Sequence, residues 1–179
     1  GNLLRKVPLN PITNPLSSME EHPSIKTNTV LDDLFAGGLR KGQLIELYGT
    51  YGSGKTQTCF TLVCESTGKI VYIDSEGSFS PSRIKNIAKA RNKDFNEIDK
   101  RLLLIQPTDW KEQMACVHQI PDVENIQLII VDSLLAFFRD NKDFIGRENL
   151  PERQGLIRTH LADLRRLAQR YNCIVVITN

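Results

Sequence analysis

The sequence predicts an α/β fold in which a mainly parallel central sheet is covered by helices on both faces. Three observations predict it. Five apolar runs alternate with helix-compatible segments along the chain, and such alternation is typical of parallel sheets. The run at 128–131 is entirely apolar, as expected for a strand that is buried on both faces. A glycine-rich motif joins the first of these strands to a helix, and the loop at such a junction lies at the carboxyl edge of a sheet.

The chain divides into an N-terminal arm and one domain. Residues 1–24 carry four prolines among asparagine and serine, and proline removes a backbone donor and restricts the residue before it. We expect an arm or linker there, apolar enough to pack on its own domain or on a neighbouring subunit. Residues 25–179 are the predicted core, long enough to bury one sizeable hydrophobic interior.

The elements of the core follow in order. A short amphipathic helix is expected over 29–35, with Thr27 or Asn28 as its cap; Gly37 and Gly38 end it. β-Branched and aromatic residues mark the strands. The predicted strands cover residues 43–48, 69–74, 102–105, 128–132 and 173–178; the predicted helices cover 55–66, 81–92 and 110–120, and a long helix starts at Pro151 after a polar loop at 139–150.

Composition excludes several classes of protein. The chain is 40% hydrophobic and 25% charged, and its net charge of +2 is too small to indicate nucleic-acid binding by itself. No apolar run approaches the ~20 residues of a membrane span, and the first residues lack the apolar core of a signal peptide. We expect a cytoplasmic protein, nuclear in a eukaryote, with no membrane partner. The cysteines and histidines have no metal-site spacing, so four reduced core thiols are expected.

The glycine-rich motif carries the clearest chemistry. It reads GTYGSGKT and fits the phosphate-binding pattern G-x-x-x-x-G-K-[ST], between a predicted strand and a predicted helix. Glycines let backbone N–H groups surround a phosphate, and the helix N-terminus adds positive charge. Lys55 would reach the β- and γ-phosphates and Thr56 would bind Mg²⁺. The predicted nucleotide contacts are Gly49, Thr50, Tyr51, Gly52, Ser53, Gly54, Lys55, Thr56 and Gln57. The alternative is a flexible turn without a ligand.

Three acidic residues follow predicted strands. Asp132 ends an apolar strand downstream of the phosphate motif, the position from which a carboxylate holds Mg²⁺. Glu76 lies just past another strand end and is the candidate for orienting or deprotonating the attacking water. Asp74 is the weaker candidate and is expected to fix the strand end or loop. The alternative for Asp132 is a carboxylate that only caps the next turn. The alternative for Glu76 is a solvated acid on a loop.

The segment 139–170 is locally basic, with eight Lys and Arg against five Asp and Glu. Arginines on a loop that precedes a helix N-terminus can grip phosphates. For Arg165, Arg166 and Arg170 a solvated helix face is the preferred interpretation. For Arg147 and Arg153, at the loop and the first turn, spacing alone leaves both interpretations open.

Several segments together resemble one family. They are GSGKTQTCFTL (52–62), VYIDSEGSFSPSRI (71–84), LIIVDSLLAFFR (128–139), IGRENLPERQ (145–154) and HLADLRRLAQRYNCIVVITN (160–179). In order and in register they are similar to the RadA branch of the RecA recombinase family, over about residues 25–179. The combination with IGRENLPERQ is specific to that branch.

The resemblance implies a RecA-like P-loop NTPase sandwich of three layers and an ATP-dependent filament on single-stranded DNA, acting in homologous recombination and DNA repair. It implies ATP and Mg²⁺ as cofactors, Glu76 and Lys55 as catalytic residues, and Arg83 as the residue that stacks on adenine. It places the first DNA-binding loop at about 139–154, which we call the basic loop, and so favours DNA contacts for Arg147 and Arg153. Self-association or a partner recombinase is expected.

The chain also departs from the family's pattern. The family has glutamate where Thr50 stands, and its N-terminal domain and subunit-docking motif have no clear counterpart here. We expect a truncated core, because the family continues beyond Asn179 with a glutamine that senses the γ-phosphate. Two hypotheses follow. One is a DNA-stimulated recombinase ATPase; the other is a recombinase paralogue that binds ATP and regulates a partner's filament with weak catalysis of its own.

Overall fold

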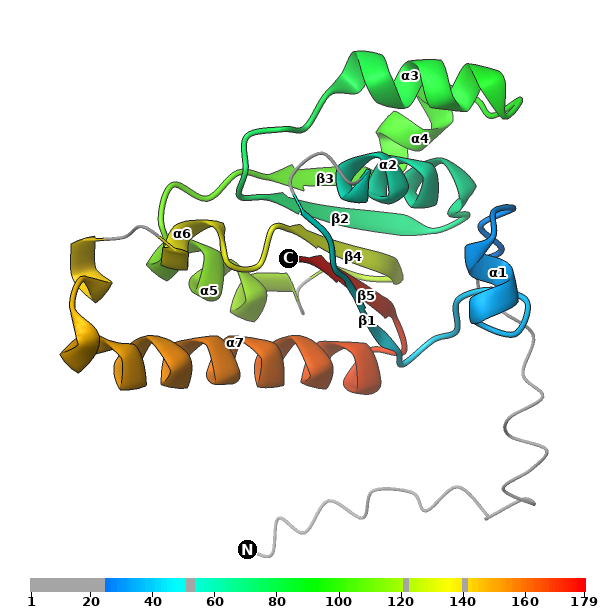
Figure 1. Ribbon diagram of the computed structural model, residues 1–179. Helices are drawn as coiled ribbons and strands as arrows, with labels where there is room; N and C mark the ends of the chain where they lie inside the picture. The colour runs from blue at the N-terminus through cyan, green and yellow to red at the C-terminus, as the bar shows by residue number, and fades with distance from the viewer. Residues whose placement is uncertain (1–24, 51–53, 121–122, 140–141) are drawn as a thin grey trace, which may run out of the picture.

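The computed structural model describes residues 25–50, 54–120, 123–139 and 142–179. Its five strands form one sheet in the order β1-β5-β4-β2-β3 (Figure 1). All four strand pairs are parallel, which confirms the predicted fold class. The strands are β1 (Leu44–Leu47), β2 (Lys69–Asp74), β3 (Leu102–Ile105), β4 (Ile126–Asp132) and β5 (Ile174–Thr178).

Helices cover both faces of the sheet, so the fold has three layers (Figure 1). The helices α2, α3 and α4 lie on one face, and α5 and α7 lie on the other. The helical elements are α1 (Leu31–Leu34), α2 (Lys55–Glu65), α3 (Pro81–Ala90), α4 (Phe95–Arg101), α5 (Trp110–Gln119), α6 (Ala136–Arg139) and α7 (Leu150–Arg170), with 3₁₀ turns at Lys142–Phe144 and Arg147–Asn149.

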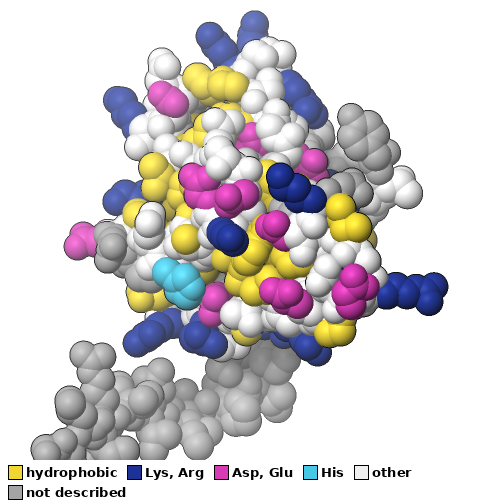
Figure 2. Space-filling model, turned by 90° about the vertical axis from the view of Figure 1, so that its left-hand side faces the viewer, with side chains coloured by type: hydrophobic (Ala, Val, Ile, Leu, Met, Phe, Trp, Pro, Cys, Tyr) yellow, Lys and Arg dark blue, Asp and Glu magenta, His cyan; other side chains and the backbone are white. Residues whose placement is uncertain are grey.

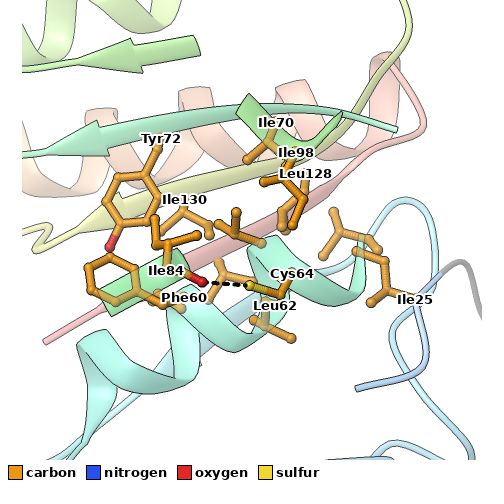
Figure 3. Close-up of a cluster of buried hydrophobic side chains, with 14 of the residues drawn as sticks. Ile25, Phe60, Leu62, Cys64, Ile70, Tyr72, Ile84, Ile98, Leu128 and Ile130 are labelled. Atoms are coloured by element: carbon orange, nitrogen blue, oxygen red, sulfur yellow. Dashed lines mark hydrogen bonds between the residues drawn. The ribbon is translucent and has the colours of Figure 1, made fainter. Parts of the chain in front are cut away.

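The hydrophobic core has two halves because side chains alternate along each strand. Ile70 and Tyr72 of β2 face α2 in the first half, whereas Val71 and Ile73 face α5 and α7 in the second. Figure 3 shows the first half, where Phe60 of α2 lies against Tyr72, with ring centroids 5.9 Å apart. Both halves are completely buried at the central strands, as expected for a parallel sheet between two helical layers.

The four cysteines are buried and free, as predicted. Burial raises the pKa of Cys64 to about 11, and the pKa values of Cys116 and Cys173 are raised to about 11 for the same reason. These thiols therefore stay protonated near neutral pH and behave as small hydrophobic side chains. Among the described residues, no helix has the length and apolar character that a membrane span requires.

The structure corrects the predicted start of the core. The residue before α1 is Val30, and no side chain caps the helix from that position, so the predicted cap at Thr27 or Asn28 is wrong. The relationship is reversed, because the Asp32 carboxylate accepts from the backbone N–H groups of Thr27 (2.7 Å) and Asn28 (2.8 Å). These hydrogen bonds lower the pKa of Asp32, although its burial acts in the opposite direction.

Two short helices and the structure of one loop also differ from what the sequence predicted. Neither α4 nor α6 was predicted from the sequence, and the segment expected to be a polar loop at 139–150 holds both 3₁₀ turns. The long helix begins at Leu150, one residue before the predicted Pro151. The predicted arm at 1–24 lies outside the described residues, so the division into arm and core stays a prediction.

Candidate functional site

A polar cleft of about 620 Å³ lies at the carboxyl edge of the sheet. Parallel α/β sheets bind ligands at this edge, because the loops that follow the strands converge there. Figure 2 shows the corresponding face of the molecule, where acidic and basic side chains lie near each other beside a hydrophobic patch. The cleft is lined by Gly49, Thr50, Gly54, Lys55, Thr56, Gln57, Glu76, Ser78, Arg83, Asp132, Ser133, Arg139 and Thr178.

The phosphate motif joins β1 to α2 at one end of this cleft. Gly54 precedes α2 with φ of +88°, a left-handed conformation that strains any residue with a Cβ atom. The Lys55 ammonium group donates to the carbonyl oxygens of Gly49 (2.5 Å) and Asn179 (2.6 Å). The lysine is thus held over the loop by backbone acceptors that a phosphate could replace. Tyr51, Gly52 and Ser53 lie outside the described residues.

The Asp132 carboxylate is the most highly hydrogen-bonded acid of the cleft. Its Oδ2 accepts from the hydroxyl groups of Thr56 (2.9 Å) and Tyr72 (3.1 Å), and its Oδ1 accepts from Thr178 (2.8 Å). Burial, together with nearby anionic groups, raises the pKa of Tyr72, so this phenol stays protonated and donates. Three hydroxyl groups therefore hold the carboxylate in one orientation beside the start of α2.

The pairing of Thr56 with Asp132 is also what a magnesium site requires. Both residues offer hard oxygen atoms at the same end of the cleft, and Mg²⁺ is bound by one or two such protein ligands plus phosphate and water. These two ligands were predicted from the sequence, whereas the contacts of Tyr72 and Thr178 with Asp132 were not. A signal existed, since Tyr72 stands two residues before Asp74 and Thr178 ends a strand, where polar residues reach the carboxyl edge.

Glu76 lies on the loop after β2, exposed and facing the same cleft. Its backbone N–H donates to the carbonyl oxygen of Asp132 (3.3 Å), as does the N–H of Ser75 (2.8 Å). The loop that carries Glu76 is therefore attached to the end of β4. Asp74 holds the other side of the loop, because its carboxylate accepts from the backbone N–H groups of Ser78 and Phe79, both at 3.2 Å. The loop-fixing role expected for Asp74 agrees with this geometry.

Arg83 and Gln57 meet beside the first turn of α2 and line the same cleft. The Arg83 guanidinium donates to Oε1 of Gln57 (2.6 Å) and lies over the ring of Phe60, 5.1 Å from its centroid. The side chain extends from the first turn of α3, which Ser80 caps by accepting from the Arg83 N–H. A planar guanidinium fixed in this way offers a flat surface for a ring, as the stacking prediction requires.

The two arginines predicted to bind DNA stand apart from the cleft. Arg147 is exposed on the second 3₁₀ turn, and Arg153 is half-buried in the first turn of α7. Neither lines the cleft, whereas Arg139 does, at the start of the basic loop. From the sequence, Arg139 belongs only to the basic segment, because its spacing does not indicate that its side chain lines the cleft.

Comparison with known proteins gives the family that the chain resembles. A sequence model of the Rad51 family matches residues 23–179. A relative is the DNA repair and recombination protein RadA of Aeropyrum pernix, which is 39% identical over 161 residues. That match covers 83% of this chain and 50% of the relative, so the chain spans about half of that protein's length.

Proposed function

Because this chain belongs to the Rad51 family, we propose that it is the ATP-binding core of a DNA-stimulated ATPase of recombination and DNA repair. The observation that carries the proposal is the cleft itself. One surface brings together a phosphate-motif lysine, a Thr–Asp pair suited to Mg²⁺ and an exposed glutamate. Those are the parts that phosphoryl transfer to water needs.

The residues present fit a bound nucleotide with its metal ion. The cleft volume of about 620 Å³ lies within the range of small-molecule sites. When a nucleotide binds, Lys55 would exchange its two carbonyl acceptors for phosphate oxygens, and Thr56 and Asp132 would hold the metal ion. Mg²⁺, when bound, neutralises charge that develops on the phosphate oxygens. Arg83 and Gln57 line the same cleft and are the proposed contacts of the base.

Glu76 is the proposed catalytic residue. Its exposed carboxylate faces the cleft from a loop fixed at both ends, so it can orient the attacking water and take its proton. Lys55 contributes positive charge at the γ-phosphate. Both side chains line the same cleft.

DNA binding is assigned to the basic loop (139–154). Arg147 and Arg153 form no ion pair within the part of the chain that the structure describes. Arg147 is exposed and can meet a phosphate directly, whereas Arg153 is half-buried and its Nε atom is buried without a hydrogen-bond partner among the described residues. Arg139 connects this loop to the nucleotide cleft. Single-stranded DNA is the proposed ligand, and other copies of the protein or a partner recombinase are the proposed neighbours in a filament.

The proposal is tested by ATP turnover with and without single-stranded DNA. The full-length protein should hydrolyse ATP faster when DNA is added, and Lys55→Ala supplies the background rate. Strand exchange is measured in parallel, by the protein alone and with an added recombinase. ATP binding without DNA stimulation or exchange would reject the recombinase ATPase. If exchange by the added recombinase then changed, a regulator of a partner's filament would replace it.

A further inference from the structure

Gln113 of α5 is completely buried and lies between three separate elements. Its Oε1 accepts from the Ser75 hydroxyl (2.6 Å), directly before the proposed catalytic Glu76. Its Nε2 donates to the carbonyl oxygen of Leu134 (3.0 Å) and contacts Nε2 of His160 on α7 (3.0 Å). One amide thus joins the loop after β2, the segment after β4 and the long helix.

The orientation of this amide follows from its partners. The Leu134 carbonyl oxygen can only accept, so it must face the NH₂ end of Gln113. The Ser75 hydroxyl then meets the amide oxygen and has to donate to it. The second N–H of the amide points at Nε2 of His160, which must accept. Reversing the amide would place two acceptor oxygens together at Leu134, which is unfavourable in a buried site.

These constraints also fix the form of His160. Because Nε2 accepts, the ring is neutral and its proton is on Nδ1. The geometry agrees with the lowered pKa of His160, which burial brings to about 4. The Nδ1 atom is buried and has no partner among the described residues. His160 therefore holds Gln113 in place without carrying a charge near neutral pH.

Aromatic contacts connect His160 and the start of α5 to the basic loop. His160 lies against the ring of Phe138, with centroids 6.5 Å apart, and Phe138 stacks on Phe144 of the first 3₁₀ turn at 5.9 Å. Trp110, three residues before Gln113, packs on both phenylalanines at 6.0 and 5.4 Å. The loop assigned to DNA and the loop of Glu76 are thus attached to the same turn of α5.

We propose that Gln113 is a positioning residue for ATP hydrolysis, which holds the Ser75–Glu76 peptide at a fixed distance from β4 and α7. The inference rests on the proposed ATPase function. Gln113 touches neither nucleotide nor metal. Its effect passes through Ser75 to the backbone of Glu76, and a misplacement of about 1 Å at a catalytic group can cost about 100-fold in rate.

The experiment measures ATP turnover of the full-length protein with saturating single-stranded DNA. Gln113→Met keeps the length of the side chain but removes the amide, and Ser75→Ala removes only the hydroxyl. We expect either change to lower kcat about tenfold while KM for ATP stays within about twofold. Gln119→Met is the matched control, because Gln119 is exposed on the same helix and should leave both constants unchanged.

Two combinations separate positioning from general destabilisation. The double variant Gln113→Met with Ser75→Ala should be no slower than either single variant, because both remove the same contact. In a Glu76→Gln background, Gln113→Met should cause no further loss. An unchanged kcat for both single variants, or independent losses in either combination, would overturn the inference. So would a KM that rises as much as kcat falls.

The two proposals fail in different ways. If the parent protein shows no ATP turnover above the Lys55→Ala background, both fall together. If the parent hydrolyses ATP with DNA stimulation and the Gln113 and Ser75 variants match it, only the positioning role is lost. Urea unfolding of each variant confirms that it is folded at the assay temperature, and Ser75→Ala serves alone if Gln113→Met is not.

Discussion

The nucleotide cleft and the basic loop hold their charged side chains in opposite ways. In the cleft, Lys55 donates to two carbonyl oxygens and Asp132 accepts from three hydroxyl groups. In the basic loop, Arg147 and Arg153 have no carboxylate partner among the described residues. The cleft is preorganised for one ligand geometry, whereas the loop offers positive charge that no carboxylate in the described part of the chain neutralises.

This difference predicts that the two regions respond differently to the removal of a charged group and to salt. A preorganised site loses its function steeply when one group is removed, because each group has a defined position. An array of unpaired charges loses affinity gradually, and its binding weakens with salt because counterions are released. The four tests below compare the two regions, from the largest expected effect to the smallest.

Lys55→Ala should remove measurable ATP binding, a loss of at least roughly 100-fold, because the ammonium group is the charge that meets the β- and γ-phosphates. Equilibrium binding of a fluorescent ATP analogue with Mg²⁺ measures it. Lys100→Ala is the control, since Lys100 is exposed on α4 away from the cleft. Undiminished binding would refute the phosphate-site assignment.

Glu76→Gln should leave ATP binding intact and slow hydrolysis by about 100-fold or more, because the amide cannot take a proton from water. Single-turnover hydrolysis separates the chemical step from product release. Glu97→Gln, on the exposed face of α4, is the matched control. If the rate of the Glu76 variant equalled that of the parent, another group would have to activate the water.

His160 lies between the two regions. Its lowered pKa predicts that the folded chain becomes less stable at acidic pH. Its pKa falls from an ordinary value of 6.5 to about 4 in the folded chain, so the unfolded chain binds more protons between those values. Stability is therefore fully present above about pH 6.5 and is lost as pH falls toward 4. Lowering pH from about 7 to about 5 should cost about 2 kcal/mol, a factor of roughly 20 to 30 in the folding equilibrium.

Urea unfolding at both pH values measures this loss. His160→Gln keeps an acceptor for Gln113 but cannot titrate, so its stability should fall less over the same pH range. His118→Gln is the control, because His118 is exposed and pairs with Asp163 at the surface. Equal losses in the parent and in His160→Gln would assign the acid sensitivity to other groups.

Arg147→Ala combined with Arg153→Ala should weaken single-stranded DNA binding roughly tenfold and reduce the slope of log K against log salt by about 1.4, for two lost phosphate contacts. A titration at several salt concentrations gives both quantities. Arg165→Ala with Arg170→Ala removes the same charge from an exposed helix face. If both pairs had equal effects, the basic loop would be no more important than the general surface charge.

Local patterns in the sequence predicted the sheet and the centre of the cleft. The five strands, their parallel arrangement and the proximity of Lys55, Thr56, Asp132 and Glu76 all depend on motifs and strand ends that can be read locally. Parallel strands place their carboxyl ends at one edge, so residues distant in sequence converge there. Arg83 and Gln57 also line this cleft, but Arg83 was named from the family resemblance and Gln57 from its place after the motif, and their roles stay predictions.

The parts that were missed depend on tertiary packing. The helix α4 has only Phe95 and Ile98 as core-facing residues, too few for a clear periodicity, although Asp94 is its cap and could have indicated it. The Gln113–His160 contact joins two helices, and no spacing rule predicts which buried polar groups meet. Asp32, inside the helix, accepts a hydrogen bond from the backbone N–H of Thr27, a residue that precedes the helix. No local pattern predicted this contact.

The order of strands in the sheet has a consequence for how the chain acquires its site during synthesis. Within the described residues, β1 pairs only with β5, which lies at the other end of the sequence. The strand that carries the phosphate loop therefore stays unpaired until residues 174–178 emerge, and closing so long a loop is entropically slow. Competence to bind ATP should therefore appear only after residues 174–178 have left the ribosome, so nucleotide capture by nascent chains would report the pairing of β1 with β5.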